Sequence, residues 1–197
     1  MSIKNLGKQS LIYGFGHVLA RLITFLLLPL YTHTFTKDEY GALSLAYAFM
    51  GFALIVYKYG MDTALMKYSV QKKGMERKKY ITLIIATQLI TSLLFTLILF
   101  LTRFNTAQYI LGADQPGWMV YLAIILFFDS LWNFPLLILR SEEKAIPYIL
   151  LSLLNVILTM VLNILLVVYL EQGIEGVFKA NIISSATIFF ISIPLII

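Results

Sequence analysis

The sequence predicts an all-α, polytopic membrane protein built as a six-helix transmembrane bundle. Three observations predict this fold class, and the first is composition. Of 197 residues, 60% are hydrophobic and only 13% are charged, and the mean hydropathy is +0.87. A soluble domain is usually about half apolar and about a quarter charged. Secondly, the apolar excess extends over the whole chain. Thirdly, its apolar segments are too long for the alternating strands of about 10 residues that build a membrane β-barrel.

Six segments are long and apolar enough to cross a bilayer. A helix rises about 1.5 Å per residue, so about 20 mostly apolar residues span the hydrocarbon core. Lys4 and Lys8 precede the first segment, as in a secretory signal. That segment is too long for a signal, contains Arg21 and lacks a small-residue cleavage site, so we expect it to remain as the first helix. The predicted spans are residues 11–31, 40–60, 81–101, 118–139, 146–170 and 177–197.

Lysine and arginine are distributed unequally between the two sides of the predicted bundle. With the N-terminus in the cytoplasm, ten of the 15 lie on the cytoplasmic side and three outside, while Arg21 and Lys58 fall within spans. The positive-inside rule therefore predicts a cytoplasmic N-terminus. The basic segment 67–79 is explained by contact with anionic lipid headgroups. Because no folded domain surrounds it, we expect no nucleic acid partner.

Catalytic motifs are absent from the sequence. The chain has no cysteine, and it lacks a nucleophile elbow, a phosphate-binding loop, a histidine-rich metal set and paired catalytic carboxylates. We therefore expect a protein that is not an enzyme and holds no cofactor or metal. Asp38 and Glu39, in the first outer loop, leave open a polyprenol-dependent membrane glycosyltransferase. An acid pair at this place also favours the start of a helix.

Arg21 lies near the middle of the first predicted span, on a helical face that it shares with Gly14, His17, Thr24 and Leu28. A polar stripe of this kind suits a bundle interior or a water-filled cavity better than lipid tails. We interpret Arg21 as a cavity arginine that contacts an anion, with His17 and Thr24 as further cavity candidates. The alternative is that Arg21 pairs with an acid and holds helices together.

The second predicted span has a similar stripe, which includes Tyr47, Lys58 and Asp62. Lys58 and Asp62 are four residues apart on a helix and are expected to pair. Lys58 and Tyr47 are also candidates for substrate contact, although Lys58 lies close enough to the inner end to snorkel toward the headgroups. The helix of this span is expected to continue past Gly60 through residues 61–66.

Asp129 is the acid at mid-membrane depth, near the middle of the fourth predicted span, with Asn133 one turn further. Its predicted role is a structural ion pair, with Arg21 as the obvious partner, or the coupling of protons or cations. Other polar residues of spans five and six are expected to form hydrogen bonds between helices. They are Asn155, Thr159, Asn163, Asn181 and Ser185.

Four short segments together resemble a known family. They are residues 11–16 followed by Arg21 and residues 28–32; residues 38–45; residues 60–68; and the turn at residues 172–177. Together they resemble the N-terminal six-helix lobe of polysaccharide flippases of the O-antigen or capsule type. These belong to the multidrug/oligosaccharidyl-lipid/polysaccharide exporter superfamily. Apolar Leu27 and Leu28 stand about where the lipid II flippases of the superfamily carry an Arg-Asp pair, which favours the O-antigen or capsule type.

The resemblance implies one lobe of a two-lobed transporter whose lobes face each other across a central cavity. It implies transfer of an undecaprenyl-pyrophosphate-linked glycan across the cytoplasmic (inner) membrane, by alternating access and without ATP hydrolysis, for the synthesis of lipopolysaccharide or capsule. Arg21 best matches the cationic side chains that meet the pyrophosphate, and Lys58 is the second match. The implied partners are the lipid-linked oligosaccharide, membrane lipids, a polysaccharide polymerase and glycosyltransferases.

Two further expectations accompany this hypothesis. The alternative within the superfamily is a drug/cation antiporter, which needs intramembrane acids; Asp129 is the single strong candidate. The last predicted span ends, still apolar, at Ile197, whereas membrane proteins usually leave the bilayer on polar residues. We therefore expect a single lobe, residues 1–197, truncated at its C-terminus; without a second lobe, two copies would have to enclose the cavity.

Overall fold

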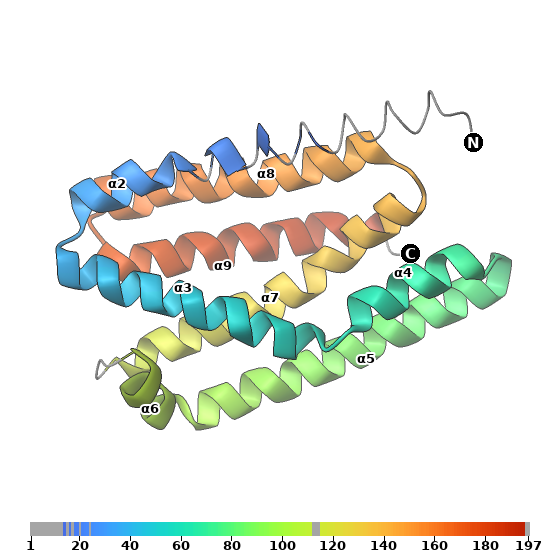
Figure 1. Cartoon of the computed structure of the whole chain (residues 1–197), viewed down its shortest axis with the longest axis horizontal. Coiled ribbons are helices and arrows are strands. Elements are labelled where there is room, and N and C mark those ends of the chain that lie inside the picture. Colours follow the sequence, from blue (N-terminus) through green and yellow to red (C-terminus); the bar gives the residue numbers. More distant parts are fainter. Residues whose placement is uncertain are drawn as a thin grey trace.

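The protein is a bundle of helices that run roughly along one common direction (Figure 1). Its structure is a computed structural model, which describes residues 14, 16, 18, 19, 21–23, 25–111 and 115–195. These residues form no strand. In chain order the elements are α2 (Leu27–Thr34), α3 (Lys37–Lys58), α4 (Met61–Gln71), α5 (Gly74–Leu101), α6 (Arg103–Thr106), the π-helical η1 (Ala107–Leu111), α7 (Pro116–Ser141), α8 (Ala145–Asn163), the π-helical η2 (Ile164–Tyr169), α9 (Gly173–Ser192) and the 3₁₀ turn η3 (Ile193–Leu195).

Five helices among the described residues are long and apolar enough to cross a membrane. This confirms an all-α, multi-pass membrane protein. The first predicted span, residues 11–31, is described in part and ends within α2; His17 and Thr24 lie outside the described residues. The five helices overlap the other five predicted spans, and they are Lys37–Lys58, Gly74–Leu101, Pro116–Ser141, Ala145–Tyr169 and Gly173–Ser192.

Helix α7 is the centre of the bundle. It packs against α3, α4, α5, α8 and α9. In its most apolar stretch 61% of the residues are buried, whereas the corresponding fraction in α5 is 17%. A helix that is hydrophobic on all sides is expected at such a central place. The outer helices instead leave large apolar side chains exposed, such as Leu93, Leu94 and Leu97 of α5, where lipid would contact them.

The turn between α2 and α3 shows what the acid pair Asp38-Glu39 does. Thr36 and Glu39 form a capping box: the Thr36 N–H donates to Glu39 Oε2 at 2.9 Å, and the Glu39 N–H donates to Thr36 Oγ1 at 3.3 Å. Asp38 and Glu39 both lie in the first turn, where the positive end of the helix dipole stabilises negative charge. The acids therefore start α3, as their position before an apolar segment predicts.

The second predicted span continues past Gly60 as expected, but through a break. Helix α3 ends at Lys58, Tyr59 and Gly60 have positive φ values of 29° and 89°, and α4 begins at Met61. Buried Gln88 of α5 lies against this break, and its Nε2 donates to the Tyr57 carbonyl at 2.8 Å and to Ser92 Oγ at 2.9 Å. A neighbouring side chain thus satisfies a carbonyl next to a break in a spanning helix, as the bilayer requires.

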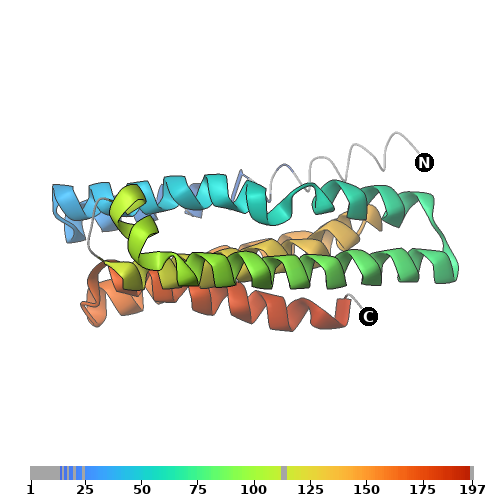
Figure 2. The ribbon, with the colours of Figure 1, turned by 90° about the horizontal axis from the view of Figure 1, so that it is seen from below.

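The two ends of the bundle differ in charge. The turns α4–α5 and α7–α8 and the end of α9 lie at the same end (Figures 1 and 2). We call this the basic end; it carries Lys67, Lys72, Lys73, Arg77, Lys78, Lys79, Arg140 and Lys144. The opposite end carries Lys37, Arg103 and Lys179. The charge asymmetry that the sequence predicts is present in the fold, and a cytoplasmic basic end remains a prediction.

Candidate functional site

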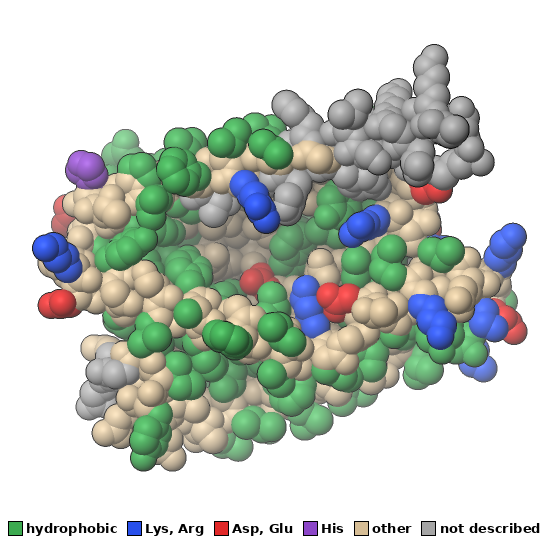
Figure 3. Space-filling model, viewed as in Figure 1, with side chains coloured by type: hydrophobic (Ala, Val, Ile, Leu, Met, Phe, Trp, Pro, Cys, Tyr) green, Lys and Arg blue, Asp and Glu red, His purple; other side chains and the backbone are tan. Residues whose placement is uncertain are grey.

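A cleft of about 420 Å³ opens between α2, α3, α8 and α9. Figure 3 shows this face of the molecule hollowed beside α3, with charged side chains lying in the hollow. The cleft combines aromatic rings with amide and hydroxyl groups, at a depth where lipid-facing helices carry apolar side chains. The polar and aromatic lining includes Tyr31, Tyr40, Tyr47, Asn155, Thr159 and Asn181.

Two tyrosines of the cleft are held in place by asparagines of other helices. The Tyr31 hydroxyl donates to Asn163 Oδ1 at 2.8 Å, and Asn163 is completely buried. Asn181 Nδ2 donates to the Tyr47 hydroxyl at 3.1 Å and to the Val177 carbonyl at 2.8 Å. These bonds connect α2 with α8 and α3 with α9. They orient the rings before any ligand is present.

Asn155 has a different environment from the other two asparagines. Its Oδ1 accepts from Thr159 Oγ1 and from Ser184 Oγ, both at 3.3 Å. Its Nδ2 is buried and has no hydrogen-bond partner among the described residues. A buried donor without an acceptor destabilises the protein by about 1 to 3 kcal/mol, so native structures rarely keep one without a use. The Asn155 amide is therefore a ready donor for an acceptor in the cleft.

Lys58 and Asp62 form the ion pair that their spacing predicts. Lys58 Nζ lies 3.4 Å from Asp62 Oδ2, and Asn133 Nδ2 of α7 donates to the same oxygen at 3.4 Å. Asp62 Oδ1 is buried and has no partner among the described residues. The pair spans the break between α3 and α4. We call this group the charged seam, and we define it as Lys58, Asp62 and Asn133.

Among the described residues, Asp129 has hydrogen-bond partners and forms no ion pair. No ion pair of Asp129 or Arg21 occurs among the described residues. Instead Asp129 Oδ1 accepts from Ser185 Oγ of α9 and from Trp132 Nε1 at 3.1 Å. The carboxylate is thus already hydrogen-bonded by its own and a neighbouring helix, and Arg21 is exposed elsewhere on the first helix.

The cleft and the charged seam share one face of α3. Tyr47 and Lys58 are 11 residues apart, which is about three helical turns and about 16 Å along the axis. They therefore point to the same side. The arrangement offers ring faces and amide groups at one end and a cation at the other.

Some residues of this site escaped the sequence analysis. The sequence predicts bonds between helices for Asn155 and Thr159; they make such bonds with Ser184 and also line the cleft. For Tyr31 the sequence predicts no contact, since the residue stands out only within the motif at residues 28–32. The polar spacing of α8 could have indicated the cleft, because Asn155, Thr159 and Asn163 recur every four residues on one face of that helix.

Comparison with known proteins agrees with this fold. The chain matches the model of a protein family described as "Polysaccharide biosynthesis protein" over residues 6–197. It matches no curated protein sequence. A solved crystal structure, described as that of a MATE mutant, is 20% identical with a TM-score of 0.69, and another structure, described as "protein A", is 17% identical with a TM-score of 0.72.

Each of these two comparisons covers 96% of this chain and 44% of the other, so the chain spans less than half the length of the structures it matches. At such identities the likeness shows the fold alone. The fold is MATE-like. Since the family model covers nearly every residue, the chain belongs to the polysaccharide biosynthesis protein family.

Proposed function

We propose that this protein is a lipid-linked oligosaccharide flippase. It moves an undecaprenyl-pyrophosphate-linked glycan from the inner to the outer leaflet of the cytoplasmic membrane by alternating access, in the synthesis of lipopolysaccharide or capsule. The observation that carries the proposal is that the aromatic and amide cleft and the charged seam lie on the same face of α3. Membership of the polysaccharide biosynthesis family supports it.

The cleft has the chemistry that a glycan needs. Sugars present apolar C–H faces and many hydroxyl groups, so a site for them combines flat apolar surfaces with a few oriented polar groups. Tyr47 is 36% exposed and its hydroxyl is oriented by Asn181. The unpaired Asn155 Nδ2 can donate to a sugar hydroxyl. A cleft of about 420 Å³ has room for a short stretch of sugar residues.

The pyrophosphate is assigned to Arg21 and Lys58. The guanidinium of Arg21 is exposed, makes no ion pair with a described residue, and has a planar fork that matches phosphate oxygens. Lys58 is held by Asp62 and would exchange that carboxylate for the phosphate. The lipid tail can stay in the bilayer while the head group crosses along the charged seam.

The test is surface glycan export in cells that depend on this protein. We expect Arg21→Ala to reduce export by about 10-fold or more, because a charge-assisted hydrogen bond contributes about 1.5 to 3 kcal/mol. The matched control is Arg103→Ala at the opposite end, where the guanidinium stacks on Phe100 and Phe104. Undiminished export in Arg21→Ala, at wild-type protein level, would remove Arg21 from the mechanism.

A drug/cation antiporter is the second candidate, and the observations that favour it are the MATE-like fold and the half-buried carboxylate of Asp129. In that case Asp129→Asn would abolish resistance to cationic drugs in cells that express the protein. The flippase proposal instead predicts that Asp129→Asn leaves drug sensitivity unchanged.

A membrane glycosyltransferase has less support, because Glu39 is engaged in the capping box of α3. Polymer synthesis assayed on membrane extracts distinguishes it. The flippase proposal predicts that Asp38→Asn and Glu39→Gln variants retain full synthesis of the lipid-linked glycan, whereas loss in either variant would favour the enzyme.

A further inference from the structure

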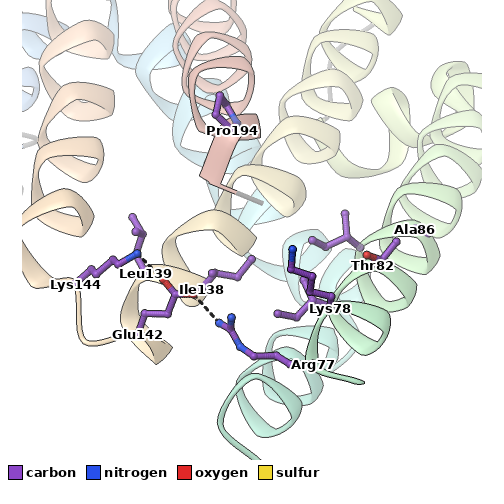
Figure 4. A pocket seen from close by; sticks show the side chains of 11 residues that line it. Arg77, Lys78, Thr82, Ala86, Ile138, Leu139, Glu142, Lys144 and Pro194 are labelled. Carbon is purple, nitrogen blue, oxygen red and sulfur yellow. Dashed lines mark hydrogen bonds and ion pairs between the residues drawn. The ribbon is translucent and has the colours of Figure 1, made fainter. Parts of the chain in front are cut away.

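A second pocket, of about 640 Å³, lies at the basic end between the start of α5, the end of α7 and η3 (Figure 4). Its charged lining consists of Arg77 and Lys78 from α5 and of Glu142 and Lys144 from the α7–α8 turn, and Thr82 of α5 adds a hydroxyl group. None of the residues that line it also lines the cleft described above.

The charges of this pocket do not balance. Glu142 is shared by two cations, since its Oε1 lies 2.8 Å from Arg77 Nη2 and its Oε2 lies 2.8 Å from Lys144 Nζ. Figure 4 shows these contacts across one side of the pocket. Lys78 is exposed and makes no ion pair with a described residue. Three cations therefore line the pocket with one carboxylate, and the site is complementary to an anion.

The remaining wall of the pocket is apolar. Ile81 and Ile85 follow the basic residues along α5, and Ile138 faces them from α7. Residues 77–79 of α5 are all basic, and the helix becomes apolar from Ile81 onward. The pocket therefore straddles the change from charged to apolar surface that a bilayer interface requires. A cationic rim next to an apolar wall is complementary to a phospholipid, whose anionic headgroup adjoins its hydrocarbon chains.

We propose that this pocket binds one anionic phospholipid of the bilayer, with its phosphate at Lys78 and the Arg77–Glu142–Lys144 cluster and an acyl chain along Ile81 and Ile85. Basic pockets between transmembrane helices are suited to acidic headgroups. The bound lipid connects α5 with the end of α7 and does not enter the transport cleft. The inference therefore does not rest on the proposed function.

The test is native mass spectrometry of the purified protein titrated with phosphatidylglycerol or phosphatidylcholine. We expect phosphatidylglycerol to saturate one binding site. Phosphatidylcholine should bind more weakly and without saturation. Lys78→Gln should weaken phosphatidylglycerol binding about fivefold, because this factor corresponds to the binding free energy that one basic residue usually contributes near a lipid surface. The control is Lys79→Gln, which removes the same charge from the neighbouring exposed residue that does not line the pocket; it should bind like the wild type.

A second pair of variants tests the apolar wall without changing any charge. Ala86 lines the pocket and is exposed, so Ala86→Phe fills the space of the acyl chain and should abolish the saturable site. Leu83→Phe adds a ring to an exposed position of the same helix outside the pocket and should not. Equal binding of the two lipids, equal affinity in Lys78→Gln and Lys79→Gln, or displacement of phosphatidylglycerol by equimolar undecaprenyl phosphate would overturn the proposal.

Discussion

At the scale of single residues, the polar groups of the cleft differ in how far the protein itself satisfies them. Asn163 and Asn181 use their amides on Tyr31, Tyr47 and backbone carbonyls, so they hold the site together. Asn155 Nδ2 and Asp62 Oδ1 are buried without a partner among the described residues. Buried groups that are left unpaired are the ones from which a ligand gains the most.

Tyr47→Phe tests whether the oriented hydroxyl contributes to transport. The change removes the group that accepts from Asn181 and keeps the ring, so the fold should persist because Asn181 still donates to the Val177 carbonyl. We expect glycan export to fall by about two- to 10-fold, because this factor corresponds to the free energy of one hydrogen bond within a membrane protein. Tyr109→Phe is the control, since Tyr109 is 87% exposed on η1. Equal export in both variants would contradict a role for the hydroxyl.

Glu142 predicts a pH dependence of stability at the basic end. Lys144, which donates to the carboxylate, and Arg77 beside it lower the pKa of Glu142 below its usual value of 4.5. Because the pKa is lower in the folded state, the stabilisation is complete above about pH 4.5 and is lost as the pH falls through the lower folded value. In detergent, the melting temperature of the wild type should approach that of Glu142→Gln as the pH falls from about 5 to about 3.

The control for this pH dependence is Glu171→Gln, which removes an acid that forms no ion pair with a described residue. Its melting temperature should follow that of the wild type at every pH. A constant difference in melting temperature between the wild type and Glu142→Gln would contradict the pairing.

At the scale of elements, the break between α3 and α4 is the feature that builds the charged seam. It places Lys58 at the end of one helix and Asp62 in the first turn of the next, and Gln88 satisfies the Tyr57 carbonyl beside it. Discontinuous spanning helices often carry the binding sites of transporters, because irregular backbone is tolerated only where it is buried or lines a cavity.

Gly60→Ala tests the break directly. Gly60 has φ of 89° and open space around its Cα, so the penalty is conformational and amounts to about 1 to 2 kcal/mol of unfolding free energy. Gly51→Ala is the matched control in α3, where the surroundings are equally open and the backbone is helical. There alanine should be neutral or stabilising by up to about 1 kcal/mol. Thermal unfolding in detergent measures the stability of both variants. Equal shifts in melting temperature would contradict a left-handed backbone conformation at Gly60.

The sequence predicted those elements that depend on local pattern. Hydropathy located the spans, the spacing of Lys58 and Asp62 predicted their pair, and the acids before Tyr40 predicted the start of α3. It did not predict which helices meet. The bond between Asp129 and Ser185 joins residues 56 positions apart, and the cleft needs four helices brought together. Such packing depends on the shape of whole helix faces, which one sequence does not encode in any short pattern.

At the scale of the whole molecule, the charge asymmetry predicts the orientation in the membrane. The chain has no cysteine, so single cysteines report on sidedness without background. Lys37→Cys and Lys73→Cys replace exposed lysines at the starts of α3 and α5, at opposite ends of the bundle. In intact spheroplasts, a membrane-impermeant maleimide should label the cysteine at position 37 and reach position 73 only after permeabilisation. The reverse pattern would contradict a cytoplasmic basic end.

We propose that the polar face of this protein carries a glycan attached to a lipid pyrophosphate across the bilayer. The most direct measurement is transfer of a fluorescent, short-chain polyprenyl-pyrophosphate oligosaccharide between the leaflets of proteoliposomes, followed by quenching with an impermeant reductant. We predict transfer well above protein-free vesicles for the wild type and for Arg103→Gln, and transfer near the protein-free rate for Arg21→Gln. Wild-type transfer at the protein-free rate, or equal transfer by the two variants, would contradict the proposed transport.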